Sequence, residues 1–132
     1  MGRKEADARR LPTDAEIDIL AVLWRLGPST VREVHEALGK ESGYTTTLKQ
    51  MQLMTEKGLL ARSERFRSHV YEASAPQDET RTQIAGDLLR RAFSGSAKSL
   101  VMGALAAEPA SREELRDIRR ILDDFEKARG LR

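Results

Sequence analysis

The sequence predicts a mainly α-helical fold with a single β-hairpin, and three observations support this. Apolar residues recur at helical spacing in six stretches, most of them separated by glycine, proline or a capping residue. Between the third and fourth stretches, residues 60–73 shift toward the alternating pattern of a hairpin. Charge is the third observation: residues 43–71 hold five basic and two acidic side chains, whereas residues 11–42 hold three basic and six acidic ones. Positive charge therefore gathers in the middle of the chain.

Two short helices are predicted first. Thr13 and Glu16 have the spacing of a capping box, which predicts a helix over residues 14–26. Thr30 and Glu33 repeat this spacing and predict a second, shorter helix that ends at a glycine. Two short helices before a third one follow the order of a helix-turn-helix.

The third predicted helix lies between Gly43 and Gly58 and has one packed face and one outward, polar face. The N–H groups at a helix N-terminus favour an anion, and short polar side chains there reach phosphates and base edges. This predicts a recognition helix that contacts DNA. The predicted contacts are Tyr44, Thr45, Thr46 and Lys49. For Tyr44, packing beneath the helix is the alternative to a phosphate contact, and the whole stretch also fits an ordinary amphipathic helix.

A β-hairpin with an arginine-rich tip follows, with its turn expected at Arg67-Ser68. Three helices followed by such a hairpin form a winged helix-turn-helix, in which the hairpin is the wing. We expect some wing residues to hold phosphates or to reach the adjacent minor groove. These residues are Arg62, Arg65, Arg67 and His69. The alternative is a solvated hairpin whose charges protect its edges from aggregation.

The remaining helical stretches carry narrow apolar stripes that cannot form much of a core alone. In the last stretch, apolar positions 115, 118, 122 and 125 step by three, four and three residues, as in a heptad seam. We therefore expect a dimer interface, with a monomeric helical appendage as the alternative. The predicted interface residues are Leu88, Phe93, Leu115, Ile118, Leu122 and Phe125.

These patterns predict three parts of the chain. Residues 1–10 mix charges without apolar periodicity, which indicates a disordered leader or, alternatively, a minor-groove arm. Residues 11–75 form the winged helix-turn-helix domain. Residues 76–129 form a helical dimerisation domain.

Composition excludes several functional classes. Without cysteine, the chain has no disulfides, thiolate metal sites or cysteine nucleophiles. Its two histidines, His35 and His69, are not accompanied by a phosphate-binding loop or a metal-ligand cluster, so we expect no enzyme activity, cofactor or metal. No apolar run approaches the roughly 20 residues of a membrane span, and no signal-peptide pattern is present. We expect a cytoplasmic protein without membrane contact.

Several motifs together resemble a known family. They are Leu11-Pro12-Thr13-Asp14-Ala15-Glu16, Ile19-Leu20, Leu23-Trp24, Thr30-Val31-Arg32-Glu33-Val34, Tyr44-Thr45-Thr46, Lys57-Gly58-Leu59-Leu60 and Val70-Tyr71. Their order and spacing are similar to those of the penicillinase-repressor (BlaI/MecI-like) family of transcriptional repressors. The resemblance implies a homodimer that binds a palindromic operator through its winged helix, dimerises through its C-terminal helices and blocks transcription. It places the start of the recognition helix at Tyr44 and the wing over residues 62–71.

Two departures limit the resemblance. In the antibiotic-resistance systems of this family, an inactivating protease cuts the repressor at an Asn-Phe pair. In this sequence, Gly103-Ala104 stands at the corresponding place. The copper-responsive branch binds metal through C-terminal cysteines, which this chain lacks. The resemblance therefore implies a protease partner without implying cleavage of that specificity.

Two functions from different classes compete. The leading hypothesis is a dimeric repressor bound to a double-stranded DNA operator. The second is a winged helix that serves as a protein-interaction module, because apolar Leu53 falls on the predicted DNA face. Retention on heparin that falls steeply with salt distinguishes the first from the second.

Overall fold

A computed structural model describes residues 11–39 and 43–131 of this 132-residue chain. The predicted leader over residues 1–10 lies outside the described residues. The chain divides into two compact units, the first ending at Gly86 and the second beginning at Asp87. The domain boundary near residue 76 that the sequence suggests stays a prediction.

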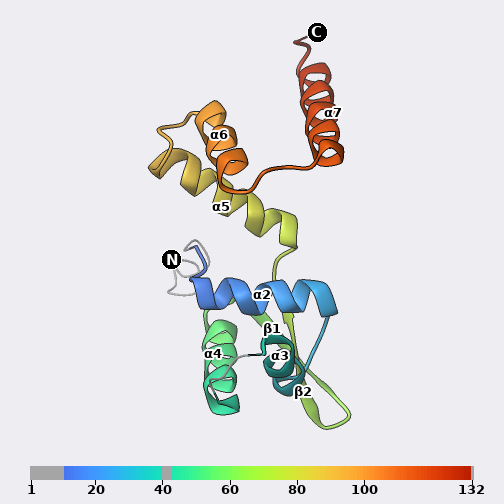
Figure 1. Ribbon diagram of the computed structural model, residues 1–132. Helices are drawn as coiled ribbons and strands as arrows, with labels where there is room; N and C mark the ends of the chain where they lie inside the picture. Colours follow the sequence, from blue (N-terminus) through green and yellow to red (C-terminus); the bar gives the residue numbers. More distant parts are fainter. Residues whose placement is uncertain (1–10, 40–42, 132) are drawn as a thin grey trace. The chain divides into compact units, whose positions relative to one another are not determined.

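Three helices open the first unit: α2 spans Asp14–Leu26, α3 spans Val31–Leu38 and α4 spans Tyr44–Glu56 (Figure 1). The predicted capping boxes are confirmed at the starts of α2 and α3. The hydroxyl of Thr13 accepts a hydrogen bond from the N–H of Glu16, and the Glu16 carboxylate accepts one from the N–H of Thr13. The same exchange recurs at the start of α3. Each box satisfies backbone N–H groups that the helix cannot, and so fixes where the helix begins.

The hairpin consists of β1, Leu60–Arg65, and β2, Ser68–Ala73, which pair antiparallel along their full lengths. The two connecting residues, Phe66 and Arg67, have φ angles of 51° and 66°. Positive φ at both positions is the geometry of a two-residue type I′ turn. The predicted turn at Arg67-Ser68 is therefore wrong by one residue. Both strands are exposed near the turn, so no alternation of buried and exposed residues marks the register there.

The core of the first unit joins the three helices to the hairpin. Its largest fully buried side chains include Tyr71, Met51, Met54 and Val34. The backbone of Tyr71 also exchanges two hydrogen bonds, of 2.8 and 2.9 Å, with that of Ser29 in the connection between α2 and α3. This bridge and the buried ring hold the wing against the helices.

Three further helices follow. The first, α5 (Gln77–Arg91), begins in the first unit and ends in the second, where it precedes α6 (Ala97–Ala107) and α7 (Arg112–Ala128). The hydroxyls of Ser96 and Ser111 cap α6 and α7 by accepting a hydrogen bond from a first-turn N–H. No side chain is buried in these two fully described helices. Their apolar residues are therefore at most partly covered within a single chain.

Phe93 lies close to the backbone of α6. A β-carbon at Gly103 would stand 3.4 Å from the Cε1 atom of the Phe93 ring. At this distance a β-carbon would be in ordinary van der Waals contact with the ring. The Gly103-Ala104 pair lies inside α6, and both residues are exposed.

We expect Met51→Ala to lower the free energy of unfolding by about 2–5 kcal/mol, because it leaves a cavity in a fully buried site. Leu53→Ala is the matched control, since Leu53 lies on the same helix and is 39% exposed. This control should change the free energy of unfolding by less than about 1 kcal/mol. Urea denaturation at one fixed protein concentration compares the two variants. Equal losses would mean that α4 packs through a different face.

Candidate nucleic-acid interface

The outward face of α4 is polar at its start. Thr45, Thr46 and Lys49 are exposed, and Tyr44 keeps 38% of its surface exposed. The buried residues of this helix are Thr47, Met51 and Met54. The predicted division into a packed and an outward face is confirmed, whereas the assignment of individual outward residues to DNA stays a prediction.

The N-terminus of α4 differs from those of α2 and α3. Its cap residue is Gly43, which has no side chain to accept a hydrogen bond, and no acidic residue lies in its first turn. Gly43 therefore supplies no capping side chain to the first-turn N–H groups, and the helix dipole adds positive potential at this end. Such an end suits a phosphate oxygen.

Tyr44 packs against α3. The guanidinium carbon of Arg32 lies 5.0 Å from the centroid of the Tyr44 ring, and the His35 ring meets it edge-on with centroids 6.0 Å apart. The Nδ1 atom of His35 lies 2.8 Å from the hydroxyl oxygen of Thr47, which links α3 to the packed side of α4. Because Tyr44 is packed and also partly exposed, neither of its two predicted roles excludes the other.

An open groove of about 350 Å³ lies between the start of α3, the outer edge of α4 and the hairpin. Tyr44 and His69 are the predicted site residues that line it. Sequence reasoning missed three exposed polar residues of its wall. They are Arg32, Gln52 and Ser68. Each stands at an ordinary surface position in its own element, so only the packing of the three elements reveals that they share a groove.

Arg65 connects the wing to α3. One of its guanidinium nitrogens lies 3.5 Å from the Glu33 carboxylate, and both side chains are 51% exposed. The backbone N–H of Thr30 donates to the same carboxylate at 2.9 Å. The Thr30 N–H, followed by the Thr30 hydroxyl and then Arg65, holds the pKa of Glu33 below its ordinary value of 4.5. An exposed ion pair adds little stability, but it places the Arg65 guanidinium beside the start of α3.

The other basic residues of the wing are spread along it. Arg62 lines a second groove with three residues of α4 and with Tyr71. His69 lies with its Nε2 atom 3.7 Å from the Glu64 carboxylate on the opposite strand. Arg67 occupies the turn and is exposed. The wing thus offers positive charge beside α4, beside α3 and at its tip.

The predicted dimer residues remain largely uncovered in a single chain. Leu88 is 45% exposed, Leu122 is 55% exposed and Phe125 is 53% exposed. The other three residues of that set are half-buried, namely Phe93, Leu115 and Ile118. An apolar stripe is therefore available on α7, and its pairing with a second copy stays a prediction.

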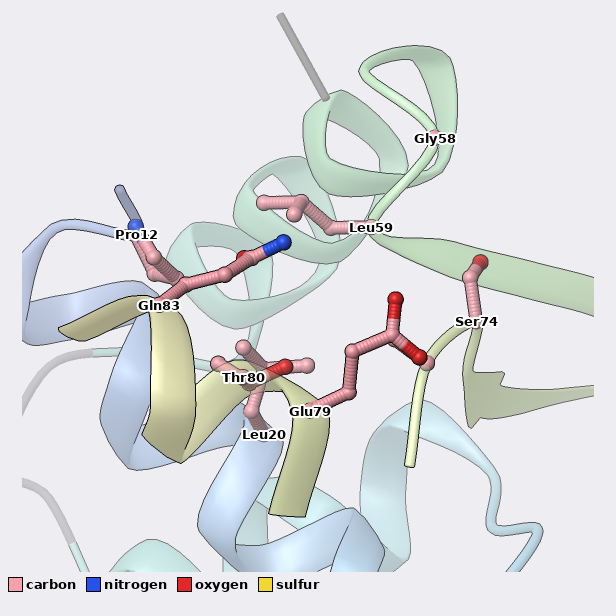
Figure 2. Close-up of a pocket in the computed structure, with 9 residues that line it drawn as sticks. Pro12, Leu20, Gly58, Leu59, Ser74, Glu79, Thr80 and Gln83 are labelled. Atoms are coloured by element: carbon pink, nitrogen blue, oxygen red, sulfur yellow. The ribbon is translucent and has the colours of Figure 1, made fainter. Parts of the chain in front are cut away.

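A pocket of about 150 Å³ lies where the start of α5 meets α2 and the segment after α4 (Figure 2). Glu79 and Gln83 extend from α5 along its wall, opposite Leu59. Glu79 is the one charged side chain of the lining, so the pocket lacks the converging polar groups of a defined ligand site.

The described residues form neither a metal-binding cluster nor a membrane-spanning helix. Across residues 11–39 and 43–131, no three His, Cys, Asp or Glu side chains gather in a way that would hold a metal ion. Among the helices described, none has both the length and the apolar character needed to cross a bilayer.

We expect the stability contributed by the Glu33 charge to depend on pH. Because the pKa of Glu33 is lowered in the folded chain, the ionised form stabilises the fold above the unfolded pKa, and this stability is lost as the pH falls through the folded value. Glu33→Gln retains a capping acceptor without the charge. In urea denaturation from neutral to acidic pH, the advantage of the wild type over this variant should shrink and vanish. A difference that does not change with pH would contradict the assignment.

Comparison with known proteins gives the family. The penicillinase repressor family matches residues 12–124. The "Transcriptional regulator BlaI" of Mycobacterium tuberculosis is 32% identical over 123 residues, covering 90% of this chain and 88% of that protein. The "Penicillinase repressor" of Bacillus licheniformis is 25% identical over 114 residues, covering 85% of this chain and 89% of that protein.

A solved structure supports the fold alone. A MarR family protein from Bacillus stearothermophilus superimposes with a TM-score of 0.50 at 19% identity, covering 97% of this chain and 83% of that one. The predicted winged helix-turn-helix is confirmed by the three helices and the two-stranded wing of the first unit. With these elements and a family match over nearly its whole length, the chain belongs to the penicillinase repressor family, whose members are transcriptional repressors and not enzymes.

Proposed function

We propose that this chain is a sequence-specific transcriptional repressor that binds double-stranded operator DNA as a homodimer. One observation carries the proposal: the uncapped, polar N-terminus of α4 occurs beside a basic hairpin in the same winged helix. The names of the relatives, a transcriptional regulator and a penicillinase repressor, agree with it. A regulator that binds DNA must share a compartment with that DNA, and the predicted cytoplasmic location meets this requirement.

In this proposal α4 enters the major groove, which is wide enough to admit a helix. Thr45, Thr46 and Lys49 address base edges, because they are exposed on its outward face. Tyr44 stands at the uncapped end, where a phosphate oxygen would meet backbone N–H groups. The Arg32 guanidinium over the Tyr44 ring brings a cation to that same phosphate.

The wing addresses the DNA backbone and the neighbouring minor groove. Its contact residues are Arg62, Arg65, Arg67 and His69. Arg65 already has an anionic partner in Glu33, so on binding it exchanges a carboxylate for a phosphate. This exchange makes the contribution of Arg65 smaller than that of an arginine without such a neighbour.

The homodimer forms through the apolar stripe on α7 together with Leu88 and Phe93. Two-fold symmetry then requires a palindromic operator, with half-sites one or two helical turns apart at about 10 base pairs per turn. A dimer seated on such an operator blocks transcription by occupying the promoter. Because Gly103-Ala104 stands at the place of the family's Asn-Phe pair, release from DNA does not use a protease of that specificity.

The first experiment is a titration of the purified protein against DNA from its own promoter region and against a scrambled duplex of equal length, at two salt concentrations. We expect salt-sensitive binding with at least about a hundredfold preference for the promoter DNA. Equal affinity for both duplexes would contradict sequence-specific recognition at that promoter.

Two substitutions separate base readout from phosphate contact. Lys49→Ala should weaken binding by about 1–3 kcal/mol on promoter DNA and far less on the scrambled duplex, because a base contact acts only on its own sequence. Arg67→Ala should weaken binding to both duplexes and lower the slope of log affinity against log salt by about one. Titrations at several salt concentrations measure both effects. Equal loss on both duplexes for Lys49→Ala would reassign this residue to phosphate.

Phe125→Glu should break the dimer, because it places a charge in the predicted apolar interface. Loss of a central aromatic contact costs about 2 kcal/mol or more of association energy. Sedimentation should show a shift toward monomer, and promoter binding should weaken in parallel. Asp124→Ala is the control, since Asp124 is exposed on the same helix and lies outside the stripe. A variant that stays fully dimeric would place the interface elsewhere.

The protein-interaction module remains a second candidate because Leu53 is 39% exposed on the outward face of α4. Under the proposed function, Leu53 meets a thymine methyl group in the major groove. Absence of binding to either duplex at low salt, with no retention on heparin, would favour the second candidate.

A further inference from the structure

The tip of the wing carries an unusual side chain. Phe66 is 95% exposed, the highest exposure among the large apolar residues that the structure describes. A phenyl ring in water gains nothing for the fold, and most large aromatic side chains bury their surface. Folding of the chain therefore gives no reason for this residue at this position.

The backbone at the same position is also costly. Phe66 and Arg67 both have positive φ, a region that side chains other than glycine, asparagine and aspartate rarely occupy. Type I′ turns strongly prefer Asn-Gly or similar pairs for this reason. Glycine would form this turn at a lower conformational free energy. The presence of two large side chains in a strained turn therefore points to a function for them.

The surroundings of the tip indicate what the ring meets. Arg65 and Arg67 flank Phe66 in sequence, so the apolar residue stands in a basic stretch of the chain. The Arg65 pair with Glu33 and the bridge between Ser29 and Tyr71 tie the hairpin to α3 and to the core. The tip thus carries an apolar group at the end of a basic hairpin, and this hairpin extends from the three-helix part of the first unit (Figure 1).

We propose that Phe66 is a wedge that enters the minor groove of the operator next to each recognition helix. The inference rests on the proposed function. Minor-groove proteins insert phenylalanine and other apolar side chains against base steps and bend the duplex, while arginines hold the groove edges. Flexible pyrimidine–purine steps open at the lowest cost, so Phe66 favours such a step at a fixed distance from the half-site. The wing thereby contributes to sequence preference without reading base edges.

Phe66→Gly tests the wedge, because glycine adopts positive φ readily and should preserve or raise thermal stability. We expect this variant to bind its own promoter DNA about tenfold more weakly, with an unchanged salt slope, because no charge is lost. Energy transfer between dyes at the two ends of the duplex should report a bend with the wild type and a smaller bend with the variant. Phe66→Leu should retain most of the bend and affinity, since leucine also serves as a wedge.

Arg67→Gly is the matched control within the turn. It also relieves positive φ, but it removes a charge and should lower the salt slope while keeping the bend. Wild-type affinity and bending in Phe66→Gly would overturn the wedge, whatever this variant does to self-association. Failure of the wild type to prefer promoter DNA would instead overturn the proposed function, so the two failures are distinguishable.

Discussion

The two backbone hydrogen bonds between Ser29 and Tyr71 are the constraint on which the candidate interface depends. They join the connection between α2 and α3 to the second strand of the hairpin, while the Tyr71 ring fills the core with 1% exposure. Tyr71 therefore anchors the wing through its backbone hydrogen bonds and packs in the core through its side chain. Because the wing cannot move without disturbing that packing, its basic residues keep a fixed relation to α3 and α4. The same link explains why Arg65 can reach Glu33 at the start of α3.

Local signals in the sequence were sufficient for much of the fold. The capping spacings at Thr13 and Thr30 predicted where α2 and α3 begin, because a cap depends only on residues three positions apart. The turn was misplaced because neither Phe66 nor Arg67 is a usual turn residue, and the exposed strand ends carry no pattern of burial. The contact of Arg32 with Tyr44 could not be predicted, since it arises only when α3 packs against α4. The outward face of α4 was predictable from helical periodicity, whereas the groove beside it was not.

The basic face is not uniformly positive. Arg65 lies beside Glu33, His69 beside Glu64, and Arg62 shares a groove with Glu56. In the free protein these neighbours limit repulsion among the cations. On DNA the same carboxylates would face phosphates, so any pose that leaves a carboxylate against the backbone is disfavoured.

The position of the Phe93 ring beside Gly103 affects which side chains fit on this side of α6. A β-carbon at position 103 would stand 3.4 Å from the Cε1 atom of the Phe93 ring, which is ordinary van der Waals contact. A larger side chain at position 103 would lie against the Phe93 ring, so the ring limits which residues fit on that side of α6.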